Sequence, residues 1–142
     1  MGRINVGRLL LGGIIAGIIF FIGDGVVHGA LLSDRWAAIM TAIGKSGADV
    51  GREHPGYFIT YDLLKGIIAL ALYAAMRPRF GAGPTTALLA ALLVWVLVIP
   101  VPMLGLLPME FFGAGFVALW AIYALVPILI GTVAGAWLYR EA

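Results

Sequence analysis

Residues 9–32 form a run of 24 amino acids that is apolar except for two side chains, Asp24 and His28. A helix of this length rises about 36 Å, which exceeds the roughly 30 Å of a bilayer's hydrocarbon core. Asp24 and His28 are four residues apart and share one helix face with Gly13 and Gly17. Inside a membrane an acidic side chain must face protein or water, and small residues mark close contact between helices. The segment therefore predicts a transmembrane helix whose polar, glycine-bearing face packs inward.

The composition extends this interpretation to the whole chain. Of its 142 residues, 63% are hydrophobic and 11% are charged, and the mean hydropathy is +1.07. A soluble domain of this size cannot bury so much apolar surface, so we expect the lipid bilayer to surround the chain. Its nine basic residues are spread over helix-flanking segments, which argues against a nucleic-acid partner. The lack of cysteine excludes disulfide, thiolate, iron–sulfur and cysteine-based zinc chemistry.

The pattern predicts an all-α integral membrane protein, an antiparallel four-helix transmembrane bundle formed by residues 1–142 as a single domain. The four spans are expected at about 9–32, 57–76, 85–107 and 111–139. Pro100 and Pro102 each remove a backbone donor, so we expect the third span to kink or break there. The first span is too long for the apolar core of a cleaved signal peptide, and no A-x-A site follows it, so we expect it to be retained.

A short amphipathic helix is expected between the first two spans, at about 34–43. Apolar side chains recur there at helical spacing, and ten residues are too few to cross a membrane. A tryptophan on the apolar side favours the headgroup level, so we expect this helix to lie on the membrane surface. The apolar positions are Trp36, Ile39, Met40 and Ile43.

Basic residues favour one orientation of the bundle. If there are four spans, five basic residues lie on the side of the chain ends and three on the other side, which predicts that both termini are cytoplasmic. We accordingly expect a multi-pass protein of a prokaryotic cell membrane. The first group is Arg3, Arg8, Arg77, Arg79 and Arg140, and the second is Arg35, Lys45 and Arg52.

A buried polar cluster is predicted between the first two spans. If these helices are antiparallel neighbours, residues at equal depth pair Asp24 with Lys65, and His28 with Tyr61 or Asp62. A charged side chain in hydrocarbon costs at least about 2.5–3.5 kcal/mol, so pairing Asp24 with Lys65 removes a large penalty from both. Glu110 is expected to join the same half of the membrane from the fourth helix. The predicted cluster comprises Asp24, His28, Asp62, Lys65 and Glu110.

Three interpretations of this cluster stay open. The simplest is that it pins the first helix to the second. A proton or ion path is the second, because ionisable residues within membranes are functional candidates, although no polar group continues the path toward the cytoplasm. The third is an axial ligand: Gly25 and Gly29 leave room beside His28 for a haem or a chlorophyll-type pigment.

No other motif predicts catalysis or a metal centre. Neither Ser33 nor Ser46 lies in a G-x-S-x-G elbow, and two histidines at such different positions as His28 and His54 do not supply a metal site. Helix packing is expected at glycines that let two backbones approach. These are Gly13, Gly17, Gly25, Gly29, Gly131 and Gly135.

The first forty-odd residues carry a recognisable pattern. A glycine-rich span is interrupted at Gly23-Asp24-Gly25, and a tryptophan-bearing amphipathic piece follows, from Asp34-Arg35-Trp36 to Gly44. This pattern resembles a bacterial family of small four-helix membrane proteins with no assigned function. The resemblance implies four helices and no particular activity.

Two classes of function remain. The chain is expected to be a non-catalytic small subunit that packs into a larger membrane-protein complex or into a homo-oligomer, because glycine pairs and aromatic surfaces suit docking. The alternative is a small proton- or ion-coupled transporter that uses the polar cluster of the first two helices. A transporter needs polar lining in both halves of the bilayer, and the sequence supplies it in one, which favours the subunit.

Overall fold

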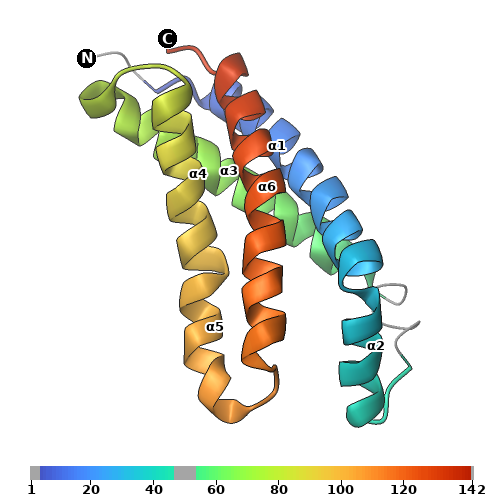
Figure 1. Cartoon of the computed structure of the whole chain (residues 1–142). Helices are drawn as coiled ribbons and strands as arrows, with labels where there is room; N and C mark the ends of the chain where they lie inside the picture. Colours follow the sequence, from blue (N-terminus) through green and yellow to red (C-terminus); the bar gives the residue numbers. More distant parts are fainter. Residues whose placement is uncertain (1–3, 47–53, 142) are drawn as a thin grey trace.

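The computed structural model of the chain describes residues 4–46 and 54–141, and every regular element within them is helical (Figure 1). Four helical stretches are long and apolar enough to cross a membrane. The prediction of an all-helical chain with four such stretches is therefore confirmed. They are Val6–Leu31, Pro55–Phe80, Pro84–Met109 and Ala114–Leu138.

The first stretch consists of α1 (Val6–Val26) followed directly by a π-helix, η1 (Val27–Leu31). The Asn5 side chain caps α1 by accepting a hydrogen bond of 3.0 Å from the backbone N–H of Arg8. In η1 the Leu32 N–H bonds the Val27 carbonyl at 2.9 Å, five residues back, so the helix is locally wider than an α-helix. The next helix, α2 (Ser33–Ala42), starts immediately after this turn.

The second stretch, α3 (Pro55–Phe80), begins two residues before and ends four residues after the predicted span. It runs through Pro78, because one proline removes one backbone donor and a single remaining turn tolerates that loss. Gly81 ends the helix at φ 83°, a conformation that glycine adopts without strain, and its N–H bonds the Arg77 carbonyl at 2.9 Å. The hydroxyl of Thr86 then donates to the Gly81 carbonyl at 2.8 Å and fixes the turn into the next helix.

The third stretch is divided where the sequence predicts a kink or break. The first piece is α4 (Pro84–Val98), the second is α5 (Pro100–Leu106), and the short 3₁₀-helix η2 (Leu107–Met109) follows. Ile99 separates the pieces with φ −122° and ψ −70°. Pro102 causes no second break, because it lies in the first turn of α5, where its missing N–H would have no partner within the helix. The last helix is α6 (Ala114–Leu138), which starts three residues later than predicted.

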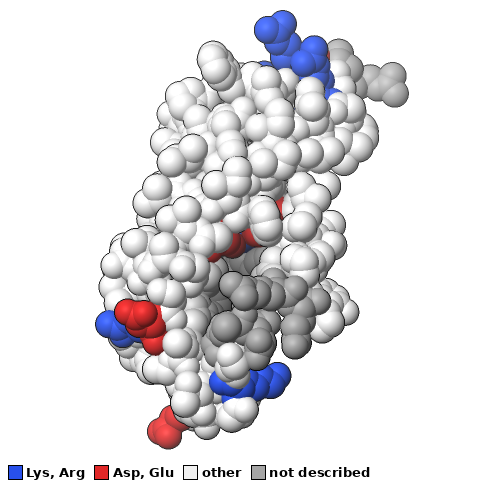
Figure 2. Space-filling model, turned by 90° about the vertical axis from the view of Figure 1, so that its right-hand side faces the viewer, with Lys and Arg blue, Asp and Glu red and all other residues white. Residues whose placement is uncertain are grey.

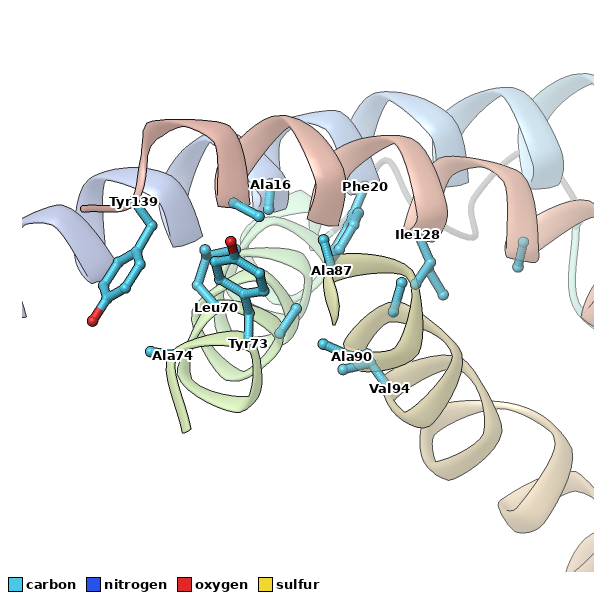
Figure 3. Packing of buried hydrophobic residues seen from close by; sticks show 14 of the residues in the cluster. Ala16, Phe20, Leu70, Tyr73, Ala74, Ala87, Ala90, Val94, Ile128 and Tyr139 are labelled. Atoms are coloured by element: carbon cyan, nitrogen blue, oxygen red, sulfur yellow. The ribbon is translucent and has the colours of Figure 1, made fainter. Parts of the chain in front are cut away.

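The core is formed where α1 contacts α3 and α6 and where α6 contacts α4. Figure 3 shows small side chains such as Ala16, Ala87 and Ala90 between the helices, with Phe20 and Leu70 filling the larger gaps. Alanine at these positions lets backbones approach closely, as is typical of helices that associate in lipid. The start of α1, the α3–α4 turn and the end of α6 lie at the same end of the bundle in Figure 1.

At the other end, α2 contacts the bundle through its aromatic side. Trp36 and Ile39 pack against a small second core that includes Phe116 and Val117 of α6. The predicted amphipathic helix therefore forms one residue earlier than expected, at Ser33–Ala42, and it lies beside the first turns of α6. Its location on the membrane surface stays a prediction. Residues 47–53 of the segment that joins it to the next helix lie outside the described residues.

Candidate functional site

Glycines on α1 and α3 bring the two helices close enough for charged side chains to meet between them. An added Cβ on Gly13 would lie 2.7 Å from the Ile67 Cα, and one on Gly17 would lie 2.7 Å from the Leu63 Cα. From the other side, a Cβ on Gly66 would collide with backbone atoms of both Gly13 and Gly17. Going along α1 from Gly13 to Gly17, the contact on α3 moves back from Ile67 to Leu63. The two helices therefore run in opposite directions at this contact, and their backbones touch.

Beyond this contact, three charged side chains form a buried group that we call the triad: Asp24 of α1 with Asp62 and Lys65 of α3. The Lys65 Nζ lies 2.8 Å from Asp24 Oδ2 and 2.6 Å from Asp62 Oδ1. Only 4% of the Lys65 side chain and 2% of the Asp62 side chain are exposed, against 17% for Asp24. The structure thus brings together three of the five residues of the predicted polar cluster, and Asp24 is the member that reaches the surface.

Hydrogen bonding within the triad is unequal. Lys65 donates a hydrogen bond to Asp24 at 2.8 Å. The Asp62 Oδ1 is closer to the same ammonium, but it is buried and not aligned for a directional hydrogen bond. The ammonium also lies 4.6 Å from the centre of the Tyr61 ring and 5.6 Å from that of Phe20, within range of cation–π attraction. One cation is thus held between two carboxylates and two aromatic rings.

The triad carries an excess of acid. If both carboxylates are ionised, the two of them and the one ammonium leave one net negative charge in a largely buried place. If one carboxyl retains its proton, the triad is neutral. Figure 2 shows mostly uncharged side chains between the two charged ends of the molecule, with acidic atoms at the bottom of a hollow in this middle region. The arrangement can exchange a proton, or it can receive a cationic or hydrogen-bonding group from outside.

His28 has different neighbours from those that the sequence predicts. The Trp36 Nε1–H donates a 2.9 Å hydrogen bond to His28 Nδ1, and the Trp120 ring meets the imidazole edge to face at 5.1 Å between centroids. The predicted pairing of His28 with Tyr61 or Asp62 is therefore wrong. Trp36 in turn contacts Phe116, with centroids 5.0 Å apart, so His28 belongs to an aromatic cluster that joins η1, α2 and α6.

This geometry does not fit an axial ligand. A neutral imidazole whose Nδ1 accepts a hydrogen bond carries its proton on Nε2, so neither nitrogen has a lone pair free for iron or magnesium. Metal-binding histidines show the reverse arrangement, in which the second nitrogen donates. Among the described residues, no group of three or more His, Asp or Glu side chains could hold a metal ion.

The remaining predicted residues divide into two groups. A Cβ on Gly131 would lie 2.6 Å from the Phe20 ring, and Gly135 meets the Gly12 carbonyl, so both lie where α6 contacts α1. Gly25 and Gly29 have open space beside them, and the structure does not place them at a helix contact. Glu110 is not brought to the triad either. It is exposed in the turn before α6, in a left-handed conformation with φ 57°.

Several contact residues were not predicted. Gly12 and Gly66 face the predicted glycines across the helix contacts, and Gly23 lies against Pro127. Trp36 and Trp120 were not predicted as partners of His28, and Trp36 was expected only as a residue at the membrane surface. Glycine spacing could have suggested Gly66 as a contact, but which glycine meets which depends on the register of two helices.

No family model, no curated protein and no solved structure matches this chain. Its function must therefore be inferred from its own residues.

Proposed function

We propose that the chain is a non-catalytic subunit of a larger membrane-protein complex, inserted in a prokaryotic cell membrane as an antiparallel four-helix bundle. Four helices of sufficient length and hydropathy support the insertion. In Figure 1, α1 starts, α3 is followed by α4, and α6 ends at the same end of the bundle, which supports the antiparallel arrangement. Arg8, Arg77, Arg79 and Arg140 lie at or near that end in the chain, which supports a cytoplasmic location for both termini.

Single cysteines test this orientation, because the chain has none of its own. Ala82→Cys in the α3–α4 turn and Ala42→Cys at the end of α2 are both exposed positions. In intact cells a membrane-impermeant maleimide should label position 42 and spare position 82, and it should label both after the cells are opened. Labelling of position 82 in intact cells would reverse the proposed orientation.

The observation that carries the subunit proposal is the exposed part of Asp24. Counted along its own helix, Lys65 lies about 15 Å from the start of α3 at Pro55 and Asp24 lies about 10 Å from the end of the first stretch at Leu31, so we expect the triad to lie within the hydrocarbon. A carboxylate at this depth, 17% exposed and sharing with a second carboxylate the one cation that the described residues bring to it, is poorly compensated if lipid tails cover it. A transmembrane helix that brings a basic or hydrogen-bonding side chain to the hollow would compensate it.

Mild-detergent extraction from the native membrane followed by size analysis tests this proposal. The chain should elute in a particle much larger than one or two copies of its 15.0 kDa. Asp24→Asn should release it from that particle, whereas Glu110→Gln, which also removes one acid but at an exposed turn, should not. A particle of one or two chains in the native extract would refute the subunit proposal.

A second candidate is a small proton- or ion-coupled transporter, which the excess carboxylate of the triad favours. Asp24 is 17% exposed and shares the Lys65 ammonium with Asp62, and ionisable side chains at membrane depth are candidates for a proton or ion route. Reconstituted protein should then dissipate a pH gradient across vesicles, and Asp24→Asn should abolish this flux. An unchanged flux in the variant would remove the triad from any transport route.

A further inference from the structure

A second polar site lies at the opposite end of the bundle from α2, where α3 ends, α4 begins and α6 ends. The three helix ends border an open cavity of about 490 Å³. Its polar lining is Tyr73, Arg77 and Tyr139, and its apolar lining includes Ala87, Val133 and Trp137. Figure 3 shows Tyr73 and Tyr139 at this end of the core. The cavity thus combines a cation with an apolar wall.

Two of the three polar lining residues, Arg77 and Tyr139, have side-chain atoms without a hydrogen-bond partner within the described residues. The Arg77 Nε and Nη1 atoms and the Tyr139 hydroxyl are all buried and unbonded there. Tyr139 is only 4% exposed, so water at the surface does not reach it. Buried donors without acceptors cost free energy, and a guanidinium costs more than a hydroxyl. A structure that keeps three such donors beside one cavity has them available for an acceptor that enters it.

Among the described residues, the acid that pairs with Arg77 does not form a hydrogen bond with it. Glu141 Oε1 lies 3.7 Å from Arg77 Nη1, which is close enough for charge attraction and too far for a hydrogen bond. The guanidinium is instead held by rings, 5.3 Å from the Tyr139 centroid and 5.8 Å from that of Tyr73. The rings fix its position and leave its donors for an oxyanion.

The start of α4 adds a positive potential to the same cavity. Gly83 and Pro84 line it, and the Gly83 N–H donates to the Tyr73 hydroxyl at 3.3 Å. The amino end of a 15-residue helix favours a nearby anion. This helix end acts together with a buried guanidinium and a buried hydroxyl that lack partners.

We propose that this cavity binds the phosphate group of an anionic phospholipid, with Arg77 and Tyr139 as its donors and the α6 surface around Val133 and Trp137 contacting the acyl chains. Trp137 is 88% exposed at the end of α6, which is typical of a tryptophan at the headgroup level. The site lies on the end proposed to be cytoplasmic, where basic pockets between helices meet anionic headgroups. The inference rests on the proposed membrane insertion and orientation, and not on the triad or on membership of a larger complex.

Native mass spectrometry of the full chain in detergent tests the inference with three probes. Dioctanoyl phosphatidylglycerol should remain bound at micromolar concentrations. Dioctanoyl phosphatidylcholine, whose phosphate is balanced by its own cation, should bind about tenfold more weakly. Inorganic phosphate, which lacks acyl chains, should not displace the anionic lipid at equal concentration. Equal binding of the two lipids, or displacement by equimolar inorganic phosphate, would overturn the lipid assignment.

Variants assign the binding to the cavity. Arg77→Gln should weaken phosphatidylglycerol binding about tenfold, because it removes the charged donor. Arg79→Gln is the matched control, since it makes the same change two residues away at an exposed position and should leave the binding unchanged. Glu141→Gln should strengthen binding, because it removes the carboxylate that competes for Arg77.

Tyr139→Phe tests the site without changing its charge. It removes only the unbonded hydroxyl, so it should weaken lipid binding several-fold and leave the melting temperature of the lipid-free protein unchanged or higher. This variant decides the matter if Arg77→Gln fails to fold. Equal lipid binding by wild type, Tyr139→Phe and Glu141→Gln would overturn the proposal.

Discussion

Lys65 should contribute far more to stability than either acid of the triad, because one ammonium serves two buried carboxylates. Lys65→Met would leave Asp24 and Asp62 facing each other, with the Lys65 position only 4% exposed and little water to replace the cation. Removing one partner of a buried ion pair typically costs about 3–5 kcal/mol, and we expect the upper part of that range. Asp24→Asn leaves Lys65 paired with Asp62 and removes the excess charge, so it should cost about 1 kcal/mol or less.

The triple variant Asp24→Asn, Asp62→Asn and Lys65→Met decides whether the charges act as a unit. With no charge left to bury, it should be about 3 kcal/mol more stable than Lys65→Met alone. Unfolding in mixed detergent micelles, followed by the loss of helical circular dichroism, measures these differences. Lys45→Met is the matched control, because it makes the same change at an exposed position and should be silent. The reasoning would be refuted if the losses of unfolding free energy in the single variants simply added up in the triple variant. It would also be refuted if Lys65→Met destabilised the protein no more than Lys45→Met does.

Three further outcomes follow from the packing. Gly66→Ala should destabilise the fold by more than about 2 kcal/mol, because its Cβ would collide with the α1 backbone, whereas Gly29→Ala faces open space and should stabilise slightly in the same unfolding assay. Trp36→Phe removes the hydrogen bond to His28 and should increase hydrogen exchange in α2 selectively. Thr86→Val breaks the bond that fixes the α3–α4 turn and should cost about 1 kcal/mol in the unfolding assay.

The helical stretches could be predicted because apolar length is a property of the sequence alone. The ends were less accurate: α3 continues past Pro78 because Gly81, and not the proline, supplies the conformation that ends a helix. The exposure of Glu110 could not be predicted either, since it follows from the left-handed turn before α6.

The neighbours of His28 depend on a local change of helix type. Along one continuous α-helix, residues eight apart, such as His28 and Trp36, lie about 12 Å apart in rise. Their 2.9 Å hydrogen bond requires the chain to leave that path, which it does through the π-helix and through Leu32 at φ −114° and ψ 7°. No proline or glycine marks this bend at Leu32. The sequence therefore assigns His28 to the polar cluster, whereas the structure places it in the aromatic one.

The register of α1 against α3 explains why equal depth is a poor criterion for an ion pair. Counted from the contact of Gly17 with Leu63, Asp24 lies further along α1 in one direction and Lys65 lies further along α3 in the other, so their Cα atoms are not at equal depth. The pair forms because each Cα–Cβ bond tilts toward the start of its own helix. In an antiparallel pair these tilts point at each other, and the long lysine side chain covers the remaining distance.

Within the triad, Asp62 and Lys65 stabilise the fold, and Asp24 is the residue that a partner could reach. Asp62 and Lys65 lie on one helix, three residues apart and almost fully buried, so their contact persists whatever happens at α1. Asp24 reaches the shared ammonium from the other helix and alone retains an exposed part. Replacing Asp24 should therefore remove a proposed partner or proton site while the stability changes little, whereas replacing Lys65 should remove both together. Loss of complex formation in a fully folded Asp24→Asn variant is the result that pinning of α1 to α3 alone would not produce.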